Sequence, residues 1–108
     1  MDITELHEGG AVVLALSGRL DSATHKAVDD KLAGVLVGPG ATVIDLSGVD
    51  YISSAGLRVL LKAAKQAKSA SNRLALAGVR PAVKEVFDIS GFTALFAIYP
   101  DRAAAVAA

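Results

Sequence analysis

The sequence predicts a single α/β domain in which helices pack on a central mixed β-sheet. Short apolar segments rich in β-branched residues alternate with longer segments whose apolar residues recur at helical spacing. In addition, the first two predicted strands follow each other directly through a Gly-Gly turn. With 108 residues, 53% of them hydrophobic and 20% charged, the chain can bury one core. We therefore expect one domain over residues 1–108, with about five strands and about four helices.

The chain begins with a predicted hairpin and a helix. Residues 3–8 and 11–18 are expected as the two hairpin strands. Apolar residues at helical spacing predict a helix within 20–37, with Asp21 or Ser22 as its N-cap. The Gly-Pro-Gly triplet that follows is typical of the end of such an element.

Strands and helices continue to alternate in the rest of the chain. The β-branched run at 41–48 predicts a buried strand, and a helix is expected to open at Ser54. The remaining segments are predicted as a strand over 72–78, a helix over 80–91 with Pro81 in its first turn, a strand over 93–99 and a closing helix over 101–108.

The helix that opens at Ser54 is amphipathic. Its apolar stripe is expected to contain Leu57, Leu60, Leu61 and Ala64. Its other side is basic, because it carries Arg58, Lys62, Lys65 and Lys68. The helix contains no acidic residue. Such a face is either simply solvated or a docking surface for an acidic partner. A nucleic-acid surface is not indicated, because the stacking aromatic residues that such sites use are absent.

Composition excludes several classes of function. Eleven Lys and Arg residues balance eleven Asp and Glu residues, so no bulk charge attracts nucleic acid. Without cysteine there is no disulfide framework and no thiolate site, and no spacing of His and carboxylates indicates a metal or another cofactor. The N-terminus does not resemble a signal peptide, and the longest apolar run is too short to insert in a membrane. We expect a cytoplasmic protein.

The adjacent residues Ser53 and Ser54 are the first candidate for chemistry. A catalytic nucleophile at Ser54 would need a base, and Asp21, His25 and Ser54 could form a triad if their loops are neighbours. However, a nucleophile elbow requires glycine two residues before the serine, and Ile52 stands there. The pattern therefore favours a helix cap or a modified serine over an enzyme.

A cap and a modified serine can coexist. One hydroxyl is sufficient to cap a helix, a contribution of roughly 1 kcal/mol, so Ser53 can cap while Ser54 points outward. A phosphate on Ser54 would lie among the free N–H groups of the helix start and would add roughly −1.5 to −2 charge to the surface. Such a site could switch the binding of a partner without unfolding the domain.

Three segments resemble the STAS-domain anti-sigma-factor antagonists of bacteria. They are SGRLDSATH, VIDLSGVDYISSAGLRVLL and LALAGVRPAVKEVFDISGF, which occur in the order and spacing of that family over nearly the whole chain. The resemblance implies a binding module without catalysis, on a mixed sheet covered by helices. It also implies that the dephosphorylated form binds an anti-sigma factor, a serine kinase of the histidine-kinase-like ATPase fold, and thereby releases the sigma factor. A PP2C-type phosphatase would reverse the phosphorylation.

The resemblance also implies the site residues. Aligned on Gly56, the phosphoserine of the family falls on Ser54, and the loop aspartate of GRLD falls on Asp21. We expect Asp21, Ser53, Ser54, Leu57 and Arg58 to contact the partner. The chain departs from the family pattern in having Ser53 where aspartate commonly precedes the phosphoserine, which leaves the kinase that recognises it open. The alternative is a STAS scaffold that phosphorylation does not control, in a lipid-transport complex or a stress-signalling assembly.

Overall fold

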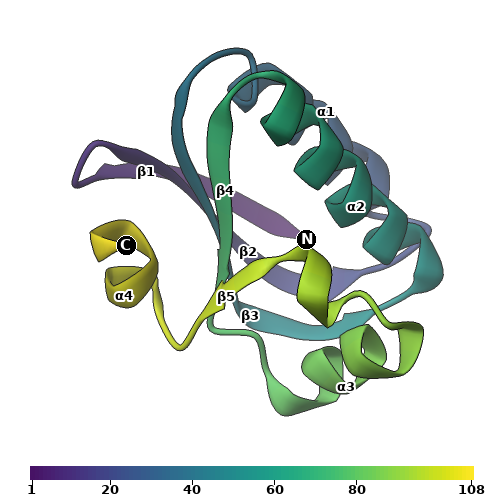
Figure 1. The fold of residues 1–108 in the computed structure, drawn as a ribbon. Coiled ribbons are helices and arrows are strands. Elements are labelled where there is room, and N and C mark those ends of the chain that lie inside the picture. The colour runs from purple at the N-terminus through teal and green to yellow at the C-terminus, as the bar shows by residue number, and fades with distance from the viewer.

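The computed structural model describes all residues, 1–108, and has the predicted α/β architecture. A five-stranded sheet has the spatial order β1-β2-β3-β4-β5 (Figure 1). Strand β1 pairs antiparallel with β2, and the other neighbours pair in parallel. The elements are β1 (Asp2–Glu8), β2 (Ala11–Leu20), α1 (His25–Val35), β3 (Gly40–Ile52), α2 (Ser54–Ser69), β4 (Asn72–Ala77), α3 (Pro81–Ser90), the 3₁₀ turn η1 (Thr93–Leu95), β5 (Ala97–Tyr99) and α4 (Arg102–Ala107).

Both faces of the sheet are covered by helices, because alternate residues of its central strands point to opposite sides. Leu14, Ile44 and Leu76 belong to the large core cluster, which also contains the buried residues of α1, α2 and α3. Val13 and Val43 point the other way, into a smaller cluster with Ala105 of α4 and two alanines of β4. Figure 1 accordingly shows α4 apart from the α1–α2 layer. No helix combines the length and apolar character needed to span a bilayer.

Helix α2 approaches the sheet most closely at Gly56. A Cβ atom at this position would lie 2.7 Å from the backbone oxygen of Leu20 and 2.9 Å from Cγ1 of Ile52. Leu20 ends β2 and Ile52 ends β3. Only glycine therefore lets the first turn of α2 rest directly on the ends of these two strands.

Some predicted boundaries are wrong. Helix α1 begins at His25, later than the predicted cap at Asp21 or Ser22, because Asp21 and Thr24 close a separate turn before it. Strand β3 continues to Ile52, past the predicted 41–48. In the predicted strand 93–99, the first three residues form the turn η1, and only Ala97–Tyr99 pair with β4.

The buried stripe of α2 is also shifted from the prediction. Leu57 and Leu60 are buried as expected, whereas Leu61 and Ala64 are only half-buried. The centre of the contact runs through Leu60 and Ala63, on the line that begins at Gly56, because the glycine contact sets the rotation of the helix. The buried positions of α2 are Gly56, Leu57, Val59, Leu60, Ala63 and Ala67.

The close approach at Gly56 can be tested by adding a single methyl group. We expect Gly56→Ala to lower the free energy of unfolding by about 1–3 kcal/mol, because the strand ends must move to admit the Cβ atom. Gly34→Ala in α1 is the matched control. Its Cβ atom would meet nothing within 4 Å, so we expect a gain of about 0.5–1 kcal/mol. Urea denaturation of both variants measures the difference, and equal stabilities would contradict the packing described here.

Candidate functional site at the start of helix α2

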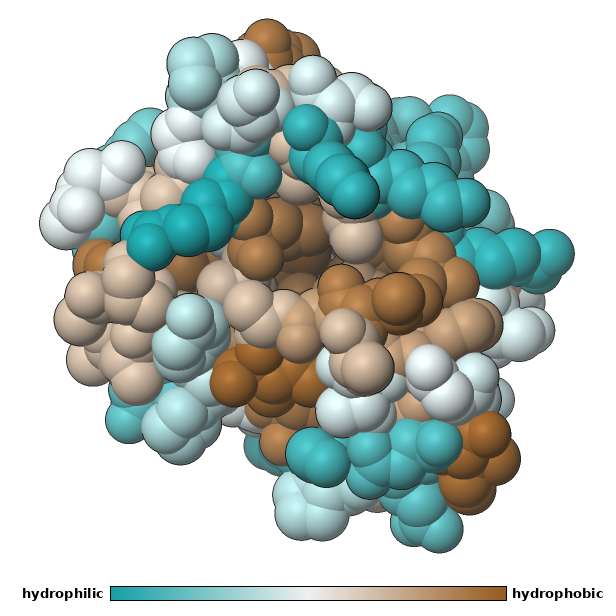
Figure 2. Space-filling view, in the orientation of Figure 1, coloured by the Kyte–Doolittle hydropathy of each residue, from teal (hydrophilic) through white to brown (hydrophobic).

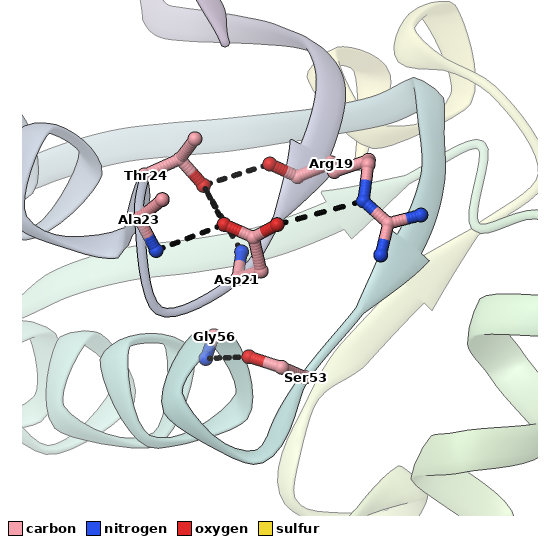
Figure 3. A network of polar contacts seen from close by, with 6 residues as sticks. All are labelled: Arg19, Asp21, Ala23, Thr24, Ser53 and Gly56. Atoms are coloured by element: carbon pink, nitrogen blue, oxygen red, sulfur yellow. Dashed lines mark hydrogen bonds and ion pairs between the residues drawn. The ribbon is translucent and has the colours of Figure 1, made fainter.

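Two loops meet at the carboxyl ends of strands β2 and β3. The backbone N–H of Ser53 donates to the carbonyl oxygen of Leu20 at 2.9 Å, so the loop that follows β2 is joined directly to the start of α2. Asp21 comes next after Leu20, and Ser54 comes next after Ser53. Figure 3 shows both segments at this edge, with the Asp21 loop beside the first turn of α2. The carboxyl ends of parallel strands are the usual place for functional loops in open α/β sheets.

The two serines have different roles. Ser53 has extended backbone angles, φ −95° and ψ 175°, and its side chain accepts a hydrogen bond from the N–H of Gly56 at 3.3 Å. Ser53 is therefore the N-cap of α2. Ser54 is the first residue of the helix, its side chain is exposed, and its hydroxyl makes no hydrogen bond within the protein. The hydroxyl of Ser54 is thus free for a partner or a modifying enzyme.

Asp21 organises the neighbouring loop. Its Oδ1 atom accepts from the N–H of Ala23 at 3.0 Å, while its own N–H donates to Oγ1 of Thr24 at 3.0 Å. The Thr24 hydroxyl in turn donates to the carbonyl oxygen of Arg19 at 2.7 Å (Figure 3). The Ala23 N–H bond is the main reason why the pKa of Asp21 lies below its ordinary value, and Thr24 and Arg19 act in the same direction against partial desolvation. The loop therefore presents a fixed negative charge.

Arg19 and Tyr51 belong to the same surface, although we did not single them out from the sequence. The Arg19 guanidinium carbon lies 4.1 Å from the centroid of the Tyr51 ring, and its Nε lies 3.5 Å from Oδ2 of Asp21. A guanidinium over an aromatic face is held by a cation–π interaction. Tyr51 is 42% exposed, which is unusual for a large hydrophobic side chain in this protein. The GRLD segment contained Arg19, but nothing in the sequence placed Tyr51 next to it.

Leu57 and Arg58 differ in how far they can reach a partner. Leu57 is only 4% exposed, so it belongs first to the core and supports the surface from below. Arg58 is exposed, makes no ion pair, and lies one helical turn after Ser54. It borders two shallow hollows, one shared with Ser54 and Phe92 and the other shared with His25.

The structure does not assemble a catalytic triad. The carboxylate of Asp21 is bonded within its own loop, and no hydrogen bond joins the His25 side chain to Asp21 or to Ser54. The structure also contains no cluster of three or more His, Cys, Asp or Glu side chains that could hold a metal ion. The arrangement is a surface with a free hydroxyl, one carboxylate and one free guanidinium.

The family model described as "Mlab, STAS domain" matches residues 3–97. The chain belongs to the STAS domain family. Among curated proteins, it is 43% identical over 100 residues to BtrV of Bordetella bronchiseptica, which is named as a candidate anti-sigma factor antagonist. That match covers 92% of this chain and 86% of BtrV. The predicted resemblance to the antagonists of this family is thereby confirmed.

Solved structures show the same fold. An anti-sigma-factor antagonist (STAS) domain protein from Planctomyces limnophilus superposes with a TM-score of 0.90 at 23% identity, covering 99% of this STAS domain and 97% of that chain. SpoIIAA of Bacillus matches in its unphosphorylated form with a TM-score of 0.76 at 19% identity, covering 95% of this chain and 92% of SpoIIAA. The phosphorylated form of SpoIIAA matches with a TM-score of 0.69 at 17% identity, covering 95% of this chain and 96% of SpoIIAA. At these identities the likeness concerns the fold.

The division of roles between the serines leads to a simple prediction. We expect Ser53→Ala to lower the free energy of unfolding by about 1 kcal/mol, because the Gly56 N–H loses its acceptor. Ser54→Ala should change it by less than about 0.5 kcal/mol, because that hydroxyl has no bond to lose. Parallel urea denaturation curves measure both. A larger loss for Ser54→Ala than for Ser53→Ala would show that Ser54 is the cap.

Proposed function

We propose that this STAS domain is an anti-sigma-factor antagonist whose binding is switched by phosphorylation of Ser54. The observation that carries the proposal is the exposed, unbonded hydroxyl of Ser54 on a helix start that Ser53 already caps. A group can therefore be added at Ser54 without removing a bond that the fold needs. The similarity to BtrV supports this assignment, and SpoIIAA, whose phosphorylated and unphosphorylated forms are both known, shares the fold.

The switch is electrostatic and steric. A phosphate on Ser54 would add roughly −1.5 to −2 charge beside the carboxylate of Asp21. The first N–H groups of α2 and the positive end of its dipole would stabilise that charge within the protein. The free guanidinium of Arg58, one turn further along, can pair with it. The phosphorylated form is thus as stable as the free form, but it presents a different surface.

The partner that senses this change is an anti-sigma factor. When Ser54 is unphosphorylated, the surface around Asp21, Ser53, Ser54 and Arg58 would contact the partner closely, and Leu57 would support this surface from below. A phosphate placed in such a contact weakens it, and each loss of about 1.4 kcal/mol lowers the affinity about tenfold. The antagonist itself would carry out no catalysis.

Two enzymes would set the state of Ser54 in the cytoplasm. The anti-sigma factor would be a serine kinase of the histidine-kinase-like ATPase fold, and a PP2C-type phosphatase would restore the free hydroxyl. Because Ser53 replaces the aspartate that usually precedes the acceptor, the kinase would recognise a less acidic surface here. Asp21, whose carboxylate is fixed by Ala23 and Thr24, would then supply a negative charge beside the acceptor.

Four baits test the proposal: the natural chain, Ser54→Ala, Ser54→Asp and, as a matched control, Ala82→Asp. Ala82 is exposed in the first turn of α3, where a negative charge is as favourable as at the start of α2, so the control adds the same charge outside the Ser54 surface. We expect a protein of the ATPase fold to bind to all baits except Ser54→Asp. Bound proteins from a lysate of the source organism are identified by mass spectrometry.

The melting temperature of each bait separates a lost contact from a lost fold. We expect Ser54→Asp to melt within about 2 °C of the natural chain, because a negative charge is favourable at a helix start. Identical proteins on all four baits would contradict the switch and indicate a constitutive STAS scaffold. A Ser54→Asp bait that is unfolded would contradict the premise that the site is independent of the fold.

A further inference from the structure

The cations of this electrically neutral chain are unevenly paired. Six of its Lys and Arg residues form ion pairs with carboxylates, and Arg80 donates to the carbonyl oxygen of Ser47. The cations without any such partner are Arg58, Lys65, Lys68 and Arg73, and all are exposed. Three of these lie on α2 and the fourth lies at the start of β4. Charge balance over the whole chain therefore hides a local positive excess.

Three of these cations border an apolar depression. Two adjoining hollows of about 290 and 260 Å³ lie between the C-terminal half of α2 and the segment that contains η1, with Lys65, Lys68 and Arg73 among their lining residues. Figure 2 shows this region as a hydrophobic, hollowed band with hydrophilic side chains along its side. We call the two hollows together with these three cations the α2–η1 groove. Its apolar lining includes Leu61, Ala64, Leu74, Leu95 and Phe96.

The groove contains apolar surface that the fold leaves uncovered. Leu95 is 59% exposed, and Leu61 and Ala64 are the two residues of α2 that were expected in the core but are half-buried. Leu61 and Ala64 face the groove because the close contact at Gly56 turns Leu60 and Ala63 of the same helix toward the sheet. Exposed apolar surface with a polar rim is typical of an interaction site.

We propose that the α2–η1 groove docks an acidic amphipathic helix of a partner protein. An amphipathic helix presents apolar residues at i, i+3, i+4 and i+7, which would cover Leu61, Ala64 and Leu95. Acidic residues beside that ridge would meet Lys65, Lys68 and Arg73, which have no partner in the chain itself. The stretch of α2 from Leu61 to Lys68 is about 10 Å long, so it can accommodate about two turns of such a helix.

Other occupants fit the groove less well. An added strand would need a free sheet edge, but β5 at this edge pairs over only three residues and offers few backbone groups. A single-stranded nucleic acid would need stacking platforms, whereas the groove is mainly aliphatic. An acyl chain would need an enclosed cavity, and these hollows are open to solvent.

The cations of this groove lie away from the Ser54 switch, whereas Leu61 borders both the groove and the hollow beside Ser54, and the groove goes beyond the proposed function. Lys65 follows Ser54 by about 16 Å along the helix axis, which is twice the screening length of about 8 Å at physiological salt. A charge at Ser54 should therefore act only weakly on the groove. The groove would add a second contact whose affinity does not depend on the state of the serine.

A synthetic peptide tests the docking site directly. The probe is a fluorescein-labelled peptide of about eighteen residues, capped at both ends, with leucine at one helical face and glutamate, glutamine and alanine elsewhere. Fluorescence anisotropy measures its dissociation constant. We expect Lys65→Glu/Lys68→Glu to weaken binding by at least about tenfold, because two attractions become repulsions. The matched control, Lys26→Glu/Lys84→Glu on α1 and α3, has the same net charge and should stay within about twofold.

Further arms exclude the other occupants. Ser54→Asp should stay within about twofold of the natural chain, so a failed switch and a failed groove give different results. A peptide of the same composition with its leucines distributed around the helix should bind at least about tenfold more weakly. The proposal is overturned if the probe does not bind to the protein at millimolar protein concentration. It is equally overturned if the peptide with distributed leucines, an oligothymidine or oleate binds as tightly as the probe. It is also overturned if sedimentation shows a dimer of this chain that Lys65→Glu/Lys68→Glu dissolves.

Discussion

The contact between the first turn of α2 and the end of β2 is the constraint on which the site depends. The Leu20 carbonyl oxygen accepts from the N–H of Ser53, and the same oxygen would lie 2.7 Å from any Cβ atom at position 56. One backbone oxygen therefore both anchors the loop and requires glycine in the helix. Because this contact holds the first turn of α2 against the end of β2, it determines the rotation of the helix and the position of Ser54.

The rest of the surface is arranged around that fixed point. Ser53 satisfies the Gly56 N–H, which leaves the Ser54 hydroxyl without a structural role. The loop after β2 is closed by its own Asp21 and Thr24, so it adds a rigid carboxylate and does not compete for Ser54. A modification at Ser54 can therefore change the charge of the surface while the fold beneath it stays the same. This separation is what a binding switch requires.

Local sequence patterns predicted most of the fold because most elements are determined locally. The hairpin, the strand at β3, the cap at Ser53 and the α3 boundary between Pro81 and Gly91 follow from turn, cap and periodicity rules. Asp21 or Ser22 was expected as a helix cap because both residue types favour caps, but here the Asp21 side chain closes a turn with Thr24. Both outcomes use the same hydrogen-bonding chemistry, so the sequence alone does not distinguish them.

What the sequence could not predict depends on contacts between distant residues. The rotation of α2, and with it the partial exposure of Leu61, depends on a backbone oxygen 36 positions before Gly56. The pairing of Lys62 with Asp29 at 3.1 Å removes one cation from the basic face and leaves Lys65 and Lys68 free. The stack of Arg19 on Tyr51 joins two strands. Tertiary distances decide each of these features.

The most direct test compares the backbone amide NMR spectra of the chain that carries phosphoserine at position 54 and of the unphosphorylated chain. Each spectrum is recorded without and with the anti-sigma partner. Without the partner, we expect phosphorylation to shift only the amide signals around Ser54 and in the loop that contains Asp21. On addition of the partner, the unphosphorylated chain should show broadened or shifted signals at this edge, and the phosphorylated chain should not. Phosphate-induced shifts throughout β2 and β3, or equal binding by both forms, would contradict the switch at Ser54.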